Sequence, residues 1–244
     1  NLKHLNPDLM NRSYDPENKY SLPYLWGSTG IGLNTSKVDV KQLKSWFDLW
    51  DNKFKGGLLL TDDMREVFHM ALKINGHSTN STDPDEIKKA YELLKRLMPN
   101  VKLFSGDPKP EFMSGNVNLG LIWSGEMATA KQENPVYEYI YPEEGTTMWI
   151  DSFVIPSRSK NVENAHKFID FMLRPDVAAR CTEELGYATP NLAGKGLLNE
   201  STRNSPIVFP SSEVLMKAEF QKDVGRADKT YQLYWNKLKT LKGG

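Results

Sequence analysis

The chain has 244 residues, of which 39% are hydrophobic and 25% are charged, and its 31 basic side chains balance 31 acidic ones. This composition is typical of a folded globular protein and excludes a long disordered or low-complexity chain. A formal net charge of zero without a clustered basic stripe also argues against nucleic acid as a partner, because binding to phosphates requires a concentrated positive surface.

The first half of the chain predicts strands that are followed by helices. Residues 22–34, LPYLWGSTGIGLN, form a glycine-rich stretch that is expected to cross from one lobe of the protein to another. Residues 56–63 predict a buried strand, and the apolar spacing in 63–74 predicts a helix directly after it. Residues 83–99 predict a second helix, because Asp83 is a suitable N-cap and is followed by a proline.

The second half continues this alternation. Strands are predicted at 116–123 and 146–156, and the second of them is another candidate crossing between lobes. Helices are expected at about 161–173, 175–185 and 228–241. Short β-rich runs that alternate with amphipathic helices are typical of parallel strands joined by helical crossovers, so the sequence predicts an α/β fold.

Three acids stand where the strand at 56–63 passes into its helix: Asp62, Asp63 and Glu66. In open α/β sheets ligands bind at the carboxyl ends of strands, and the amino end of a helix favours ionised carboxylates. One of the two aspartates is equally well explained as a plain N-cap. Three acids in five positions exceed what capping requires, so a cation site is predicted, with its acids ionised at neutral pH.

Tryptophans accompany a further acid. Trp149 and Asp151 are two residues apart in a predicted strand and share one side of it, and Trp123 ends another strand. A carboxylate beside an indole suits an organic cation, because the carboxylate accepts ammonium hydrogens while the ring covers methylenes. Trp46 and Trp50, four residues apart on a predicted helix, are instead expected to be core residues.

Metal and catalytic sites have less support. The histidines lack HxxxH and HExxH spacing, and the single cysteine, Cys181, excludes a disulfide and a cysteine-based zinc cluster, so neither metal nor cofactor is expected. Ser124 lacks the glycine two residues earlier that a nucleophile elbow needs, and GSTGIG at 27–32 does not match a dinucleotide fingerprint. A carboxylate pair for glycoside hydrolysis stays open, because it is defined by a distance of roughly 5 to 10 Å.

Nine segments, in order along the chain, resemble the spermidine/putrescine-binding proteins of bacterial ABC transporters. They are LPYLWGSTGIGLN, SWFDLWD, KGGLLLTDDMREVFHMAL, LMPNV, VNLGLIWSGE, MWIDSFVIP, FMLRPDVA, LGYATPNLA and EFQKDVG. The resemblance implies the type II periplasmic-binding-protein fold, in which two α/β lobes joined by crossing strands hold the ligand in a cleft. It places residues 1–27 and 150–195 in the first lobe and residues 28–149 and 196–244 in the second. Family members carry a further upstream segment, so the first lobe is expected to be incomplete.

The resemblance also implies a polyamine site. Its residues, by their positions in the matching motifs, would be Asp63, Glu66, Ser105, Trp123, Trp149, Asp151, Tyr187 and Gln221. Asp151 would sit deep and meet an inner amine of the ligand, and the other two acids and the glutamine would lie nearer the terminal amines. The aromatic side chains would form the walls.

The sequence therefore predicts a non-enzymatic periplasmic protein, expected to be monomeric, that closes on a polyamine by hinge motion and delivers it to the membrane permease of an ABC transporter. Spermidine is expected to be preferred over putrescine, because acids spread over three segments suit three cationic nitrogens. Two alternatives use the same residues. One is a carbohydrate-active hydrolase with the tryptophans as sugar platforms, and the other is a binder of another organic cation.

Overall fold

The computed structural model describes residues 1–242, so the last two residues of the expected second lobe, 243 and 244, lie outside the described part. The chain divides into two compact units. Unit 1 consists of Asn1–Gly27 and Trp149–Pro210, and unit 2 consists of Ser28–Met148 and Ser211–Gly244.

Two long strands contain residues of both units. The strand β1 (Ser21–Asn34) passes the boundary after Gly27, and β6 (Thr147–Val154) passes it after Met148. Both boundaries fall in stretches that the sequence predicts as crossings. The third boundary follows Pro210, so residues 196–210, expected in the second lobe, belong to unit 1.

Side-chain contacts explain where residues 196–210 lie. The ring of Phe209 packs edge-on against Trp26, with 6.3 Å between the ring centres. The Glu183 carboxylate accepts a hydrogen bond of 2.6 Å from the Thr202 hydroxyl and one of 2.9 Å from the Asn199 N–H. These contacts tie the segment to other parts of unit 1.

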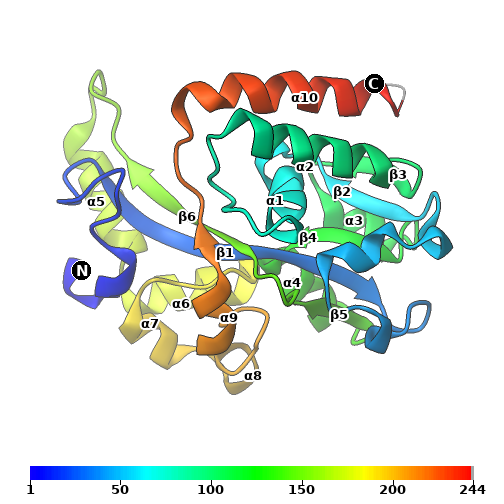
Figure 1. The fold of residues 1–244 in the computed structure, drawn as a ribbon. Helices are drawn as coiled ribbons and strands as arrows, with labels where there is room; N and C mark the ends of the chain where they lie inside the picture. Colours follow the sequence, from blue (N-terminus) through cyan, green and yellow to red (C-terminus); the bar gives the residue numbers. More distant parts are fainter. Residues whose placement is uncertain (243–244) are drawn as a thin grey trace. The chain divides into compact units, whose positions relative to one another are not determined.

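The sheet of unit 2 is mixed (Figure 1). Its strands follow the order β3-β2-β4-β1, and β1 is also next to β6 and β5. The strand β2 pairs in parallel with β3 and β4, β1 runs antiparallel to β4 and β5, and β7 pairs in parallel with β6. The strand bounds are β2 (Leu58–Thr61), β3 (Val101–Ser105), β4 (Leu119–Trp123), β5 (Tyr137–Ile140) and β7 (Glu219–Phe220).

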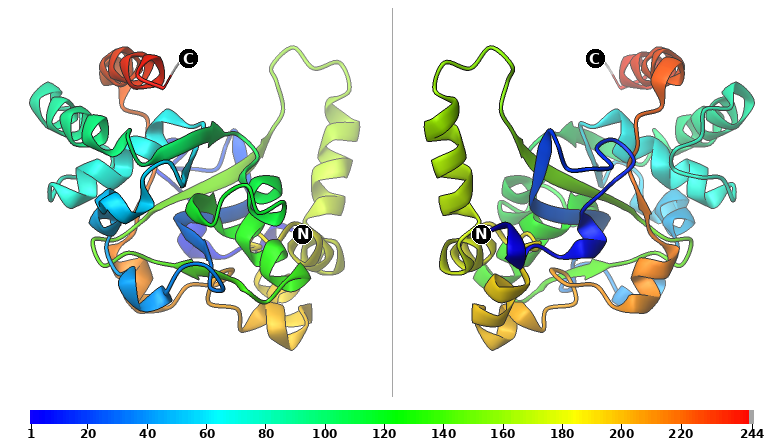
Figure 2. Two further views of the ribbon diagram at one scale, coloured as in Figure 1. Left: turned by 90° about the vertical axis from the view of Figure 1, so that its right-hand side faces the viewer. Right: turned by 90° about the vertical axis from the view of Figure 1, so that its left-hand side faces the viewer.

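Helices cover both faces of this sheet. The helices α1, α2 and α10 pack together over one face, and α3 and α4 lie over the other (Figures 1 and 2). The first three enclose a large apolar core, while Phe112 of α3 and Met127 of α4 pack against the second face. The bounds are α1 (Met64–Ile74), α2 (Pro84–Leu97), α3 (Pro108–Met113), α4 (Ser124–Glu133), α9 (Ser212–Lys217) and α10 (Asp228–Thr240). Short 3-10 helices lie at Val40–Gln42, Trp46–Trp50, Asn52–Phe54 and Gly225–Ala227.

Unit 1 is smaller. Its helices are α5 (Val162–Met172), α6 (Pro175–Leu185), α7 (Leu192–Leu197) and α8 (Glu200–Arg203), with 3-10 helices at Leu2–His4 and Pro7–Leu9. Leu5, Ile169 and Leu173 form an apolar core, while Tyr20 and Phe168 are exposed. This core contains far fewer side chains than the core enclosed by α1, α2 and α10.

The α/β fold and its main helices and strands confirm the sequence predictions, but β1 runs antiparallel to β4 and β5 where the sequence predicts parallel strands. At the start of α2, the Asp83 carboxylate accepts hydrogen bonds from the N–H groups of Asp85 (2.7 Å) and Glu86 (3.3 Å), as expected of an N-cap. No helix among residues 1–242 is both long and apolar enough to span a membrane.

Trp46 is a core residue, as predicted, but it lies in a 3-10 helix instead of an α-helix. Ser45 and Asp48 form a capping box at the start of this short helix. Asp51, which follows its last residue, is the N-cap of the next 3-10 helix, so the first helix ends after five residues. The Trp46 side chain is 0% exposed, and its indole N–H donates a hydrogen bond of 2.8 Å to the Gly145 carbonyl.

We expect Trp46→Phe to lower the free energy of unfolding by about 1 to 3 kcal/mol, because it leaves the Gly145 carbonyl without its donor and opens a cavity. Urea unfolding would measure the change. Phe47→Leu is the matched control, because Phe47 is 52% exposed and its replacement should cost less than about 0.5 kcal/mol. Equal losses in the two variants would contradict the core assignment.

Candidate ligand-binding site

The three acids after β2 have three different environments. Asp63 caps α1, since its Oδ1 accepts hydrogen bonds from the N–H groups of Arg65 (2.8 Å) and Glu66 (3.0 Å). Asp62 forms an ion pair of 2.7 Å with Lys239 of α10. Glu66 alone is buried, at 2% exposure. The N-cap explanation is therefore right for Asp63, and Asp62 has a cation of its own.

Glu66 lies among polar groups from three parts of unit 2. Its Oε1 accepts a hydrogen bond of 2.6 Å from the side-chain amide of Gln221. Thr29 of β1 lies beside the same carboxyl. Behind it, the Nδ1–H of buried His69 donates to the Glu66 backbone carbonyl at 2.5 Å and is 3.7 Å from Oε2. The carboxyl is thus held from several sides and shielded from water.

Burial decides the charge of this cluster. It raises the pKa of the Glu66 carboxyl to about 8, although the nearby Thr29 hydroxyl, the hydrogen bond from Gln221 and the charge of Arg65 act in the opposite direction. Burial also lowers the pKa of His69 to about 3. At pH 7, therefore, Glu66 is largely protonated and His69 is neutral. The prediction that the acids are ionised at neutral pH is wrong for Glu66. Burial destabilises the charged carboxylate more than the neighbouring hydrogen-bond donors stabilise it.

Two other predicted residues of unit 2 end strands of the same sheet. Trp123 is half-buried and pairs in register with Thr29, which lies beside Glu66, so Trp123 belongs to the same edge. Ser105 ends β3, but its hydroxyl donates to the Asp107 carbonyl at 2.9 Å and accepts from the Asp107 N–H at 3.1 Å. The Ser105 hydroxyl is therefore occupied within its own turn.

The predicted residues of unit 1 form a second group. Trp149 and Tyr187 pack edge to face, with 5.1 Å between ring centres. The indole N–H of Trp149 is buried and has no hydrogen-bond partner among residues 1–242. Asp151 is exposed, and the protein around it still raises the pKa of its carboxyl by desolvation. An aromatic pair and an exposed carboxylate thus occur in unit 1, although the resemblance implies the second lobe for Trp149 and a deep position for Asp151.

Sequence reasoning missed two neighbours of these acids, Tyr24 and Thr29. The pKa of the Tyr24 hydroxyl is raised by burial, by Cys181 and by the charge of Asp151, so Tyr24 lies near that carboxylate. Both residues belong to the stretch 22–34, which drew notice for its glycines. The signal that could have found them is the prediction that this stretch crosses between lobes, and the structure shows that its strand contains residues of both units.

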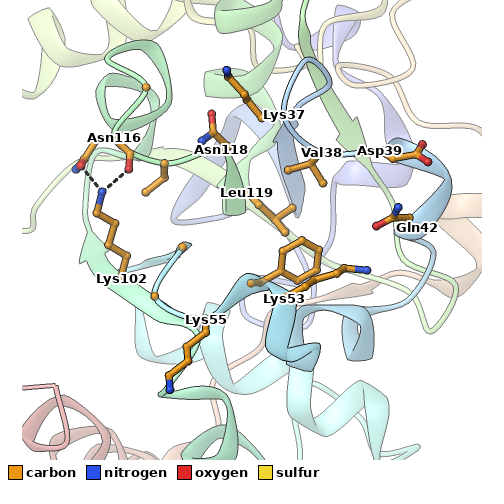
Figure 3. Close-up of a pocket in the computed structure, with 15 residues that line it drawn as sticks. Lys37, Val38, Asp39, Gln42, Lys53, Lys55, Lys102, Asn116, Asn118 and Leu119 are labelled. Carbon is orange, nitrogen blue, oxygen red and sulfur yellow. Dashed lines mark hydrogen bonds between the residues drawn. The ribbon is translucent and has the colours of Figure 1, made fainter.

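A cavity at the opposite edge of the unit 2 sheet is basic (Figure 3). It has a volume of about 730 Å³ and lies where the parallel strands begin, so it is at the far end of those strands from Glu66. Its lining includes Lys37, Lys53, Lys55 and Lys102, the last of which donates to the backbone and side-chain oxygens of Asn116 at 2.6 and 2.7 Å. Four ammonium groups make this cavity unsuitable for an organic cation.

No group of three or more histidine, cysteine or carboxylate side chains within residues 1–242 is arranged to hold a metal ion. The arrangement at Glu66 instead offers carboxyl and amide oxygens to a hydrogen-bond donor. Aromatic faces and one exposed carboxylate are the corresponding groups of unit 1. These are the groups that recognise amines.

Comparisons with known proteins agree with this chemistry. The family described as bacterial extracellular solute-binding protein matches residues 1–195. The spermidine/putrescine-binding periplasmic protein of Escherichia coli is 49% identical over 240 residues, which are 98% of this chain and 69% of that protein. Among solved structures, a putative spermidine/putrescine ABC transporter protein from Listeria monocytogenes is 36% identical and superposes with a TM-score of 0.92, covering 97% of this chain and 74% of that one. The spermidine/putrescine ABC transporter substrate-binding protein of Streptococcus pneumoniae is 35% identical, with a TM-score of 0.85 and coverage of 98% and 74%.

The raised pKa of Glu66 predicts a pH-dependent stability. The folded protein keeps a proton that the unfolded chain loses between pH 4.5 and about 8, so this group makes stability fall as pH rises through that window. His69 has the opposite effect, but only below its ordinary pKa of 6.5. Between pH 6.5 and 8.5 we expect Glu66 to lower the free energy of unfolding by about 2 kcal/mol.

Glu66→Gln should remove this slope, because glutamine mimics the protonated acid and can still accept from Gln221. Urea unfolding at several pH values would measure it. Glu92→Gln, an exposed change on α2, is the control and should keep the parental slope. An unchanged slope in Glu66→Gln would contradict the assigned protonation.

Proposed function

The chain belongs to the bacterial extracellular solute-binding proteins, and among them to the spermidine/putrescine-binding proteins of the periplasm, and from this premise we propose that it captures a polyamine and delivers it to the permease of an ABC transporter. It is a periplasmic binding protein and not an enzyme, so the hydrolase alternative is set aside. The observation that carries the assignment is the 49% identity to the Escherichia coli protein over 98% of this chain.

The Glu66–Gln221 pair gives this assignment a physical basis in unit 2. An ammonium group can donate to both side-chain oxygens, and its charge compensates a carboxylate that burial otherwise disfavours. The ligand would then take the place of the proton on Glu66. Asp63 would contribute the carboxylate oxygen that does not cap α1, whereas Asp62 is already neutralised by Lys239.

Unit 1 would supply coverage of the methylenes. The Trp149 indole, held edge to face by Tyr187, offers an apolar face, and Asp151 offers a carboxylate on the same strand. Cation–π attraction adds roughly 0.5 to 2 kcal/mol for an ammonium at such a face. The proposed ligand residues are Asp63, Glu66, Ser105, Trp123, Trp149, Asp151, Tyr187 and Gln221. Ser105 has the least support, because its hydroxyl already bonds within its turn.

We further propose that the protein acts as a monomer toward its permease and prefers spermidine to putrescine. The preference rests on the number of acids in the set, since putrescine would leave one desolvated carboxylate without a cation. Binding tests should use an extended chain, which we define as these 244 residues preceded by whatever part of the Escherichia coli relative comes before its 240 matched residues. The affinity measured for the extended chain then includes any contribution from residues upstream of this sequence.

Asp151→Asn should weaken spermidine binding about a hundredfold in the extended chain, because the amide leaves an ammonium without its countercharge. Calorimetric titration gives the Kd. Asp176→Asn is the control, because Asp176 is an exposed acid of unit 1 that pairs with Arg174 and should not alter binding. Binding by Asp151→Asn within about threefold of the parent would show that the proposed site is wrong.

Trp149 should act through its ring. We expect Trp149→Ala to weaken spermidine binding about tenfold or more and Trp149→Phe to weaken it less, because phenylalanine retains part of the apolar face. Trp50→Phe should leave the Kd unchanged, since the Trp50 indole N–H donates to Leu93 within unit 2. If spermidine still shifts tryptophan emission in a Trp123→Phe, Trp149→Phe double variant, the wall assignment fails.

A further inference from the structure

Gln221 reaches Glu66 from a segment with little regular structure of its own. The preceding strand, β7, has two residues, and residues 221–224 are neither strand nor helix. The Gln221 backbone N–H donates to the Met148 carbonyl at 2.8 Å, and no further ladder bond follows it within the described residues. A two-residue strand is too short to fix this side chain, so other contacts must hold the segment.

The side chain of Asn80 supplies two of these contacts. Its amide nitrogen donates to the Phe220 carbonyl at 2.9 Å, and its oxygen accepts from the Lys222 N–H at 2.8 Å. It therefore bonds the backbone on both sides of Gln221, with one donor and one acceptor, as a neighbouring strand would. Asn80 therefore supplies hydrogen bonds to the backbone beside Gln221, where β7 has ended and no neighbouring strand supplies them.

The two hydrogen bonds from the Asn80 side chain to Phe220 and Lys222 form what we call the Asn80 bridge. Arg65 connects this bridge to α1, the helix that contains Glu66. Its guanidinium donates to the Lys222 carbonyl at 3.2 Å, to the Thr79 carbonyl at 3.1 Å and to the Asn80 side-chain oxygen at 3.2 Å. The same group lies 5.3 Å from the centre of the Tyr231 ring. A planar fork that contacts all these partners is specific to arginine.

The other end of the segment is held through Glu219. Its carboxylate forms an ion pair of 2.9 Å with Lys73 of α1 and accepts a hydrogen bond from the Ser78 hydroxyl. Residues 219–222 are thus attached to α1 and to the 78–80 turn at both ends. Gln221 is the side chain of this segment that bonds Glu66.

We propose that Asn80 and Arg65 are positioning residues for polyamine binding. They fix the backbone at 220–222 so that the Gln221 amide stays over the Glu66 carboxyl, and they set the affinity for the amine that this pair binds without touching the ligand. The proposal rests on the proposed function. Its physical reason is preorganisation, because a segment that is ordered before binding does not lose its freedom on binding.

Calorimetric titration of the extended chain with spermidine tests this. Asn80→Ala should weaken binding about tenfold, corresponding to the cost of ordering one or two residues. Arg65→Lys, which keeps the charge and loses the fork, should also weaken it. In a Gln221→Ala background, Asn80→Ala should cost less than about twofold, because there is no longer an amide to position.

Hydrogen exchange supplies a readout that a general loss of stability would not give. In Asn80→Ala the Lys222 amide should exchange faster, while amides in α2 keep the parental rate. Asn116→Ala is the matched control, because Asn116 is an asparagine of unit 2 with side-chain hydrogen bonds to Lys102 and Glu111, and it should change neither affinity nor exchange at 222.

Two results would overturn the proposal alone. One is a Kd within about twofold of the parent in both Asn80→Ala and Arg65→Lys. The other is a loss of affinity on Asn80→Ala that is equally large with Gln221 present and in the Gln221→Ala background. A parent protein that binds no polyamine would overturn the proposed function, and this proposal with it.

Discussion

The burial of the Glu66 carboxyl beneath Gln221 is the constraint on which the rest of this site depends. A carboxylate removed from water is unstable without a countercharge, and here burial raises its pKa to about 8. Within the described residues, the fold supplies an amide donor and a neutral histidine but no cation in contact with Oε1. A ligand that brings an ammonium group therefore completes the arrangement, whereas a neutral sugar would not.

A strand, an N-cap and the first turn of a helix position the Glu66 carboxyl. The strand β2 delivers the chain to α1, Asp63 caps the helix, and Glu66 follows in its first turn. The parallel strands bring Trp123 to the same edge and leave the lysine-lined cavity at the other. Unit 2 thus has a buried carboxyl at one end of its parallel strands and four lysines at the other. The Asn80 bridge then fixes Gln221, which the short strand β7 could not hold alone.

Much of the fold could be predicted because its signals are local. The N-cap of α2 and the apolar period of α1 are each contained within a few residues. The details of the site are not local. Asp62 is 177 residues from Lys239, and Asn80 is 140 residues from Phe220. Acid type and spacing indicated a cation site, but burial alone distinguishes Glu66 from its neighbours. Likewise, no local pattern places residues 196–210 in unit 1, because Phe209 reaches Trp26 through the fold.

Proton release on binding tests the central claim most directly. Spermidine is titrated into the extended chain at pH 7 in two buffers of different ionisation enthalpy, and the difference in heat counts the protons exchanged. The account predicts a net release that approaches one proton per ligand and disappears in Glu66→Gln, because the ammonium group displaces the Glu66 proton. Binding without proton release, or an equal release from Glu66→Gln, would contradict it.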